Sequence, residues 1–220
     1  MIVKSIKFIL TNNIFRKEDY WYSFRRSILM DESKYKRSVL KNLQTIYKTK
    51  YFIETGTLYG DTTIAMQPFF HKLFTIELSD NLYTICKNKF KKFNNIVPLH
   101  GDSRFELKKV IPLLDAPSTF FLDGHFSGGS TSCGDISHPV LEEIAIIASS
   151  AIKDHVIVID DISDFSPAEG NPRLSEIIKS IENINLNYKF YSDYDMLFAL
   201  PNEEKFRFFW RKIAPWFVIR

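Results

Sequence analysis

The sequence predicts an α/β fold with a mostly parallel β-sheet. Short apolar segments rich in Phe, Ile, Val and Thr alternate with longer amphipathic segments over two thirds of the chain, and this alternation is typical of βαβ units. Most of the apolar segments end in an acidic residue or a glycine, so polar groups are expected where the strands end. The expected strands of the repeat are residues 51–54, 73–77, 95–99, 119–123 and 156–160.

Helices are expected after these strands, and a hairpin is expected after the last helix. A helix should begin near Asp61, and the spacing of apolar residues predicts further helices over 80–93, 103–114, 139–151 and 173–184. Two more strands, 188–191 and 196–200, flank Asp193 and Asp195, which favour a tight turn. The sequence therefore predicts seven strands, helices on both faces of the sheet and a C-terminal antiparallel hairpin.

Composition and charge fit a globular protein. A chain of 220 residues is expected to form one main domain, at roughly 100–200 residues per domain. The net charge of +3 is too balanced to indicate nucleic-acid binding. Cys86 and Cys133 lack the spacing of a zinc site and are expected to be reduced thiols of a cytoplasmic protein. The N-terminal run, broken by Lys4 and Lys7, lacks the apolar segment of a signal peptide, and no transmembrane segment is expected.

The two ends of the chain fall outside the repeat. Residues 1–45 are rich in basic and aromatic side chains, and we predict that they form a helical extension or lid, with residues 46–220 as the main domain. Residues 205–220 are basic and aromatic. We expect them to dock on the core, with peripheral contact to a membrane surface as the alternative. The sequence leaves a homo-oligomer open.

A glycine-bearing loop follows the first predicted strand, in the run FIETGTLYGDTT (52–63). Gly56 and Gly60 permit a sharp turn and the close approach of a ligand to the backbone. A dinucleotide-binding fingerprint would need a glycine where Glu54 stands. This carboxylate would repel a pyrophosphate, and no lysine or arginine occurs between residues 51 and 71 to offset it. The same carboxylate suits the cationic amino-acid end of S-adenosylmethionine.

Acidic residues also follow the next two predicted strands. Glu77, in FTIELSD (74–80), has the position and charge to bind ribose hydroxyls, and Asp102, in LHGDS (99–103), can accept from the adenine amino group. A helix N-cap is the alternative role for each acid, but ligands of open α/β sheets bind at this edge, which favours a binding site. The predicted cofactor-binding residues are Glu54, Thr55, Gly56, Thr57, Gly60, Thr62, Thr63, Glu77, Leu78, Ser79, Gly101, Asp102, Ser103 and Asp123.

With these motifs, residues 51–161 resemble the class I S-adenosylmethionine-dependent methyltransferases. Within that class they most resemble the metal-dependent sugar O-methyltransferases of the macrocin O-methyltransferase type. The resemblance implies a Rossmann-like seven-stranded sheet and S-adenosylmethionine as the cofactor. It also implies transfer of a methyl group to a sugar hydroxyl of a glycan or glycoside.

Two later motifs carry the reacting groups that the resemblance implies. Asp123 and His125 stand in TFFLDGHFSGG (119–129), and Asp160 and Asp161 stand in VIVIDDI (156–162). By the resemblance, Asp123, Asp160 and Asp161 would hold a magnesium or manganese ion, which would also relieve the repulsion between them. The metal would activate the acceptor hydroxyl, and Asp123 or His125 would take its proton. A Gly- and Ser-rich segment, residues 127–138, follows where the resembled family is expected to have a shorter connection.

Other functions share parts of this pattern. A catechol-like small molecule offers the same pair of neighbouring hydroxyls as a sugar and is the nearest alternative acceptor. A NAD-binding Rossmann oxidoreductase shares the sheet and the acidic ribose ligand, but Glu54 stands where its glycine fingerprint should be. A nucleic-acid acceptor is disfavoured because the chain lacks both a strongly basic surface and the Asn/Asp-Pro-Pro-aromatic motif of amino-methylating DNA enzymes. A non-catalytic binding protein is disfavoured by the intact acidic set.

Overall fold

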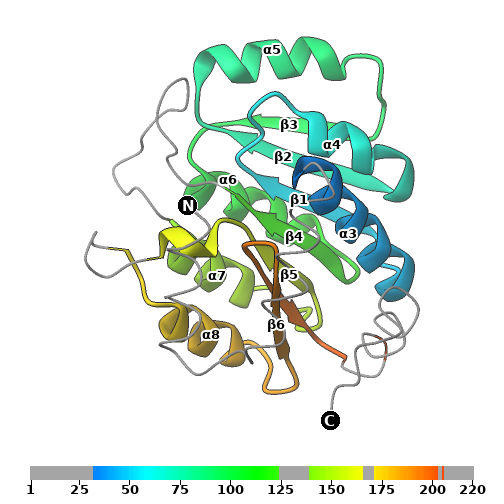
Figure 1. Cartoon of the computed structure of the whole chain (residues 1–220). Coiled ribbons are helices and arrows are strands. Elements are labelled where there is room, and N and C mark those ends of the chain that lie inside the picture. Colours follow the sequence, from blue (N-terminus) through cyan, green and yellow to red (C-terminus); the bar gives the residue numbers. More distant parts are fainter. Residues whose placement is uncertain (1–31, 124–138, 166–170, 203–204, 206–220) are drawn as a thin grey trace.

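The computed structural model describes residues 32–123, 139–165, 171–202 and 205. Strands and helices alternate along these ranges (Figure 1). The strands are β1 (Tyr51–Thr55), β2 (Lys72–Glu77), β3 (Ile96–His100), β4 (Ser118–Leu122), β5 (Val156–Ile159), β6 (Lys189–Asp193) and β7 (Met196–Leu200). The helices are α3 (Glu32–Tyr47), α4 (Asp61–Met66), α5 (Asp80–Phe90), α6 (Ser103–Val110), α7 (Val140–Ala148) and α8 (Leu174–Glu182).

The strands form one sheet in the order β3-β2-β1-β4-β5-β7-β6. Strands β1 to β5 run parallel to one another, while β7 pairs antiparallel with both β5 and β6. The predicted seven-stranded sheet and its C-terminal hairpin are thereby confirmed. The five parallel strands lie within one residue of their predicted bounds, because each apolar run ends at a clear change to polar or turn-forming residues.

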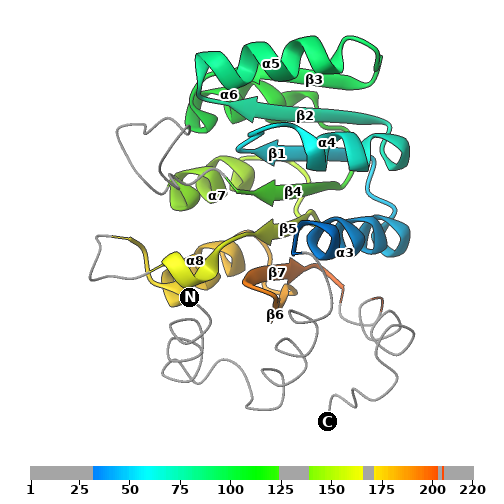
Figure 2. The ribbon, with the colours of Figure 1, turned by 45° about the horizontal axis from the view of Figure 1, so that its top comes forward.

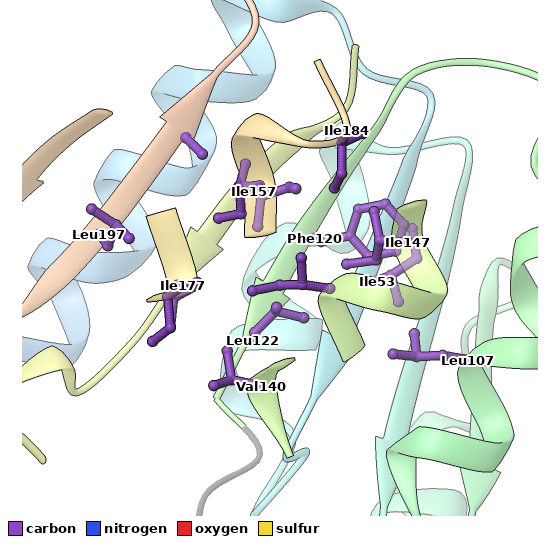
Figure 3. Close-up of a cluster of buried hydrophobic side chains, with 14 of the residues drawn as sticks. Ile53, Leu107, Phe120, Leu122, Val140, Ile147, Ile157, Ile177, Ile184 and Leu197 are labelled. Atoms are coloured by element: carbon purple, nitrogen blue, oxygen red, sulfur yellow. The ribbon is translucent and has the colours of Figure 1, made fainter. Parts of the chain in front are cut away.

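Helices cover both faces of the sheet, as predicted (Figure 2). Helices α3, α4 and α5 pack on one face, and α6, α7 and α8 pack on the other. Successive residues of a strand point to opposite faces, so Phe120 belongs to the core under α6–α8 and Phe121 to the core under α3–α5. The α6–α8 core includes Ile53, Leu107, Phe120, Ile147, Ile157 and Ile177 (Figure 3).

The predicted helix over 103–114 is shorter than expected. The α-helix α6 ends at Val110 and continues as a 3-10 turn, Ile111–Leu113. Pro112 lies within that turn, and proline lacks the N–H that an α-helix would need and crowds the preceding turn. The chain therefore leaves the helix early and enters β4 at Ser118.

Helix α3 crosses the predicted boundary between residues 45 and 46. Leu40 and Leu43 of α3 are fully buried. Together with Tyr35 and Tyr47 they join the core on the face of the sheet that α3, α4 and α5 cover. Within the described residues, α3 is thus packed on the sheet, while the boundary itself remains a prediction and residues 1–31 lie outside the described ranges. No helix in these ranges is long and apolar enough to cross a membrane.

Candidate functional site

The carboxyl ends of the parallel strands form a continuous edge that brings the predicted residues together. Each backbone segment that leaves one strand end donates a hydrogen bond to the neighbouring strand. These bonds run from Gly101 N to Glu77 O at 3.0 Å, from Gly56 N to Ile76 O at 3.0 Å, from Asp123 N to Thr55 O at 3.1 Å and from Asp160 N to Leu122 O at 3.0 Å. The acids predicted from separate motifs therefore lie in one row.

The loop between β1 and α4 turns sharply next to this row. Gly56 and Gly60 have φ angles of +84° and +74°, and Leu58 between them has a φ of +49°. This left-handed backbone favours glycine. A Cβ on Gly60 would lie 2.4 Å from Phe90 Cζ, so the loop packs closely on α5. Cys86 of α5 is buried, and its thiol donates to Leu58 O at 3.1 Å.

Glu54 lies beneath the loop and is buried. It accepts hydrogen bonds from Thr63 and, at 2.8 Å, from Thr75. Thr57 also contacts Thr75, with 2.6 Å between the hydroxyl oxygens. Burial raises the pKa of Glu54 to about 7, and the two threonine hydroxyls oppose that rise. Glu54 therefore ties α4 to β2, while Thr57 ties the loop to β2 through Thr75, and Glu54 leaves an acid at the base of the predicted cofactor site.

Glu77 stands at the end of β2 and holds the same loop from the other side. Its Oε2 accepts from Leu58 N at 2.9 Å, and its Oε1 accepts from Ser79 N at 2.9 Å. Each carboxylate oxygen can accept more than one hydrogen bond, so capacity remains for a pair of ribose hydroxyls. Leu78 lies between Glu77 and Ser79 at this edge and is partly exposed.

Two of the predicted cofactor residues cap helices. Ser79 is the N-cap of α5, and Asp102 is the N-cap of α6. Asp102 accepts from Arg104 N at 2.8 Å and forms an ion pair with the Arg104 side chain at 2.6 Å. The hydrogen bonds to Arg104 lower the Asp102 pKa. The carboxylate is thus already engaged by its own helix, and its contact with adenine remains a prediction, as do those of Gly101, Ser103 and Thr62.

A buried acid that the sequence analysis did not single out, Glu143 of α7, lies at this edge. It is 1% exposed, and burial raises its pKa to about 7, while Ser103 and Thr55 act in the opposite direction. Within the described ranges, neither Glu143 Oε1 nor Thr55 Oγ1 reaches a partner with normal hydrogen-bond geometry. The only sequence signal was a glutamate on the apolar face of a predicted helix.

We expect the raised pKa of Glu143 to make the free energy of unfolding fall as the pH rises. Below its ordinary value of 4.5 the carboxyl is protonated in both states. Between 4.5 and about 7 only the folded state keeps the proton, so stability declines through this window. Glu143→Gln should remove about 1–3 kcal/mol of that decline between about pH 4.5 and pH 8. Urea unfolding at these two pH values measures the change in the free energy of unfolding for both proteins.

The neighbouring Glu142 gives a matched control for this experiment. It is on the same helix but only partly buried. Glu142→Gln should leave the pH dependence of unfolding as in the unmodified protein. Equal pH dependence in Glu143→Gln and the unmodified protein would contradict the raised pKa of Glu143.

The acids at the ends of β4 and β5 form the second half of the site. Asp123 is partly exposed, but its limited hydration raises its pKa well above the ordinary value, and Asp160 and Asp161 raise it further. Asp161 has a φ of +51°, which turns the chain away after β5. Asp123 therefore lies close enough to Asp160 and Asp161 for their charges to repel one another.

A lysine lies where the predicted metal ion would bind. Lys36 Nζ of α3 is 2.7 Å from Asp160 Oδ1 and 3.5 Å from Asp161 Oδ1. Across residues 32–123, 139–165 and 171–202, no group of three or more acidic, histidine or cysteine side chains is arranged to hold a metal ion. The metal site predicted at Asp123, Asp160 and Asp161 is therefore not supported, because an ammonium group already pairs with two of these carboxylates.

Several predicted features lie outside the described residues. They are His125, the Gly- and Ser-rich segment 127–138, Cys133 and nearly all of the C-terminal segment 205–220. Their predicted roles stay predictions.

Comparisons with known proteins identify the fold. No family model and no curated protein matches the sequence. Among solved structures, a Staphylococcus aureus protein described as a caffeoyl-CoA O-methyltransferase matches with a TM-score of 0.54 and 12% identity over 92% of this chain and 100% of its own. The Bacillus cereus O-methyltransferase in complex with SAH matches with a TM-score of 0.53 and 13% identity over 91% and 100%.

A third solved structure is the O-methyltransferase TomG from Streptomyces achromogenes, in complex with SAM. It matches with a TM-score of 0.51 and 11% identity over 75% of this chain and 78% of its own. The chain therefore has the Rossmann-like fold of S-adenosylmethionine-dependent methyltransferases.

Proposed function

We propose that this protein is an S-adenosylmethionine-dependent O-methyltransferase that acts on a sugar hydroxyl of a glycan or glycoside. The observation that carries the proposal is the row of acidic strand ends, from Glu77 through Glu54 to Asp123 and Asp160, within a methyltransferase fold. One half of this row faces a glycine-bearing loop suited to the cofactor, and the other half offers carboxylates suited to a hydroxyl-bearing acceptor.

The residues of the first half fit S-adenosylmethionine. Glu77 has acceptor capacity for ribose hydroxyls beyond its two backbone bonds. Thr55 Oγ1 and Glu143 Oε1 are buried polar atoms that reach no partner with normal hydrogen-bond geometry within the described ranges, and a ligand at this edge could satisfy them. The left-handed Gly56 lets the backbone of the loop approach a ligand closely.

The second half of the row offers a base that can remove the proton of the acceptor hydroxyl. When bound, S-adenosylmethionine supplies a methyl group on a sulfonium, and the electron pair of the broken S–C bond stays on sulfur. Asp123 takes the proton from the acceptor hydroxyl as its oxygen forms the new bond to carbon. The raised pKa of Asp123 makes this carboxylate a stronger base than an ordinary surface aspartate. His125, the second predicted base, is a further candidate for this role.

Carboxylates near the acceptor position favour a ligand with several hydroxyl donors. Asp123 and Asp161 both keep some exposed surface, so each can accept a hydrogen bond from a ligand. A sugar offers more such donors than a flat aromatic ring. A catechol-like acceptor is the second candidate, and its support is the likeness in fold to the protein described as a caffeoyl-CoA O-methyltransferase.

The first stage of the test measures cofactor binding by calorimetry. The protein should bind S-adenosylmethionine, and Glu77→Ala should weaken that binding by about 1–3 kcal/mol, the range for loss of charge-assisted hydrogen bonds. Glu182→Ala, at the exposed C-terminal end of α8, is the control and should bind normally. Binding of NADH in place of S-adenosylmethionine would show that the fold serves an oxidoreductase.

The second stage identifies the acceptor. Glycosides and catechols are supplied at equal concentration with labelled S-adenosylmethionine, and methylated products are detected by mass spectrometry. We expect turnover of glycosides. Turnover confined to catechols would keep the proposed chemistry and replace the proposed acceptor.

A further inference from the structure

Lys36 forms ion pairs with three acidic side chains. Besides Asp160 and Asp161, its Nζ lies 2.8 Å from Glu32 Oε1, one helical turn earlier in α3. An ammonium group has three N–H donors, which matches these three carboxylates in number. The Lys36 side chain is 13% exposed and that of Asp160 is 3% exposed. This is a partly buried ion pair, for which removal of one partner leaves an uncompensated charge.

We propose that Lys36 is the built-in cation of this carboxylate cluster, in the place of a divalent metal ion, and that methyl transfer needs no added metal. The statement about methyl transfer rests on the function proposed above. The statement about the cation rests on the contacts of Lys36 alone.

The contacts of Asp160 Oδ1 already use this oxygen as an acceptor from Lys36 and from the backbone. Asp160 Oδ1 accepts from Lys36 Nζ at 2.7 Å and from Asp161 N at 3.0 Å. Magnesium binds its oxygen ligands at about 2.0–2.1 Å in nearly octahedral geometry. A metal on this oxygen would therefore have to displace at least one of these hydrogen bonds, and it would lie close to the positive charge of Lys36.

The packing of α3 holds Lys36 at this position. Leu40 and Leu43 are fully buried in the core on the sheet face that α3 covers. At the other side of the lysine, the Tyr35 hydroxyl donates to Asp193, and the Tyr35 ring lies 4.9 Å from the Tyr194 ring. These two sets of contacts fix α3 on the sheet. Lys36 can therefore leave the acidic cluster only by a change in its own side-chain conformation.

The ammonium group remains charged in this setting. Burial acts to lower the pKa of Lys36, but Asp160 and Asp161 outweigh burial and raise it above the ordinary value. The positive charge also acts on Asp123, whose pKa it lowers against the larger opposing effect of limited hydration. Lys36 is thus a positioning residue that balances Asp160 and Asp161 beside the proposed base.

Direct measurement of Mn²⁺ binding tests the proposal without reference to activity. Free Mn²⁺ gives a paramagnetic resonance signal that diminishes on binding. The unmodified protein and Lys36→Arg should leave the signal of free Mn²⁺ unchanged. Lys36→Met removes the charge at similar length and exposes the carboxylates to solvent cations, so it should bind Mn²⁺ at least about tenfold more tightly. Lys41→Met, on the exposed side of α3, is the control and should behave as the unmodified protein.

Activity forms the second arm of the experiment. Methyl transfer by the unmodified protein should be the same in EDTA and in Mg²⁺, while Lys36→Met should be slower in EDTA and should recover in part with Mg²⁺. Loss of activity of the unmodified protein in EDTA would overturn the proposal. Mn²⁺ binding by the unmodified protein that Asp160→Asn abolishes would overturn it as well, even if Lys36→Met fails to fold.

The two proposals fail in different ways. If no acceptor is methylated under any condition, the proposed function fails, while the Mn²⁺ titrations still decide whether Lys36 fills the cation site. If Lys36→Met folds and gains no Mn²⁺ binding, the cluster is not a cation site, and the inference about Lys36 is wrong whatever the acceptor.

Discussion

Replacement of Asp123 by asparagine should slow methyl transfer by about 10²–10⁴-fold, the range expected for loss of a general base. Asparagine keeps the size of the side chain and its capacity for hydrogen bonds, but it cannot take a proton at neutral pH. The rate should be measured with saturating S-adenosylmethionine and acceptor, so that the loss is assigned to the chemical step. Binding of S-adenosylmethionine should be measured as well, because Asp123 is also one of the predicted cofactor-binding residues.

The same substitution should not destabilise the protein. The carboxyl of Asp123 is poorly hydrated and is repelled by Asp160 and Asp161, so removal of its charge should leave the thermal midpoint equal or higher. Asp154→Asn is the control, because Asp154 is exposed and lies just before β5, at the opposite end of the strand. If Asp123→Asn keeps its rate within a few-fold of the unmodified protein, another group takes the proton, and His125 becomes the first candidate.

The fold and the row of acids could be predicted because both depend on local patterns. The apolar run of each parallel strand and its polar end are visible within a few residues, as in β1 with Glu54 and β5 with Asp160. A right-handed βαβ repeat then brings the carboxyl ends of the strands to one edge without further information. The order of the motifs along the chain was enough to collect Glu77, Glu54 and Asp123 into one site.

The role of Lys36 could not be predicted, because it depends on tertiary packing and not on a local pattern. Lys36 lies 124 positions before Asp160 in the chain, and only the packing of α3 on the sheet brings the two together. Taken alone, the sequence motifs that contain Asp123, Asp160 and Asp161 favour a metal ion, since three converging carboxylates need a positive charge among them. That requirement is sound, but a sequence motif does not tell whether a metal ion or a distant lysine meets it. Glu143 was missed similarly, because its burial depends on how α7 meets β1 and α6.

Replacement of Gly60 by alanine should lower the free energy of unfolding by about 2–5 kcal/mol, from two separate causes. Gly60 has a φ of +74°, which costs a residue with a Cβ roughly 1–2 kcal/mol. The new methyl group would also lie 2.4 Å from Phe90 Cζ and 3.4 Å from Cys86 Sγ, and overpacking of this kind costs about 1–3 kcal/mol. Urea unfolding measures the sum.

A double-mutant cycle with Phe90→Leu separates the two causes. Leucine shortens the side chain that the methyl group would meet, so Gly60→Ala should be less harmful in the Phe90→Leu background by about 1–2 kcal/mol. The backbone cost should persist in both backgrounds, because no change at Phe90 alters the left-handed conformation of residue 60. Purely additive effects would mean that the ring is not the obstacle. Because Gly60 closes the loop that Glu77 holds through Leu58 N, Gly60→Ala should also weaken S-adenosylmethionine binding. Phe90→Leu should restore part of that binding in the double mutant, which would link the packing of α5 to the cofactor site.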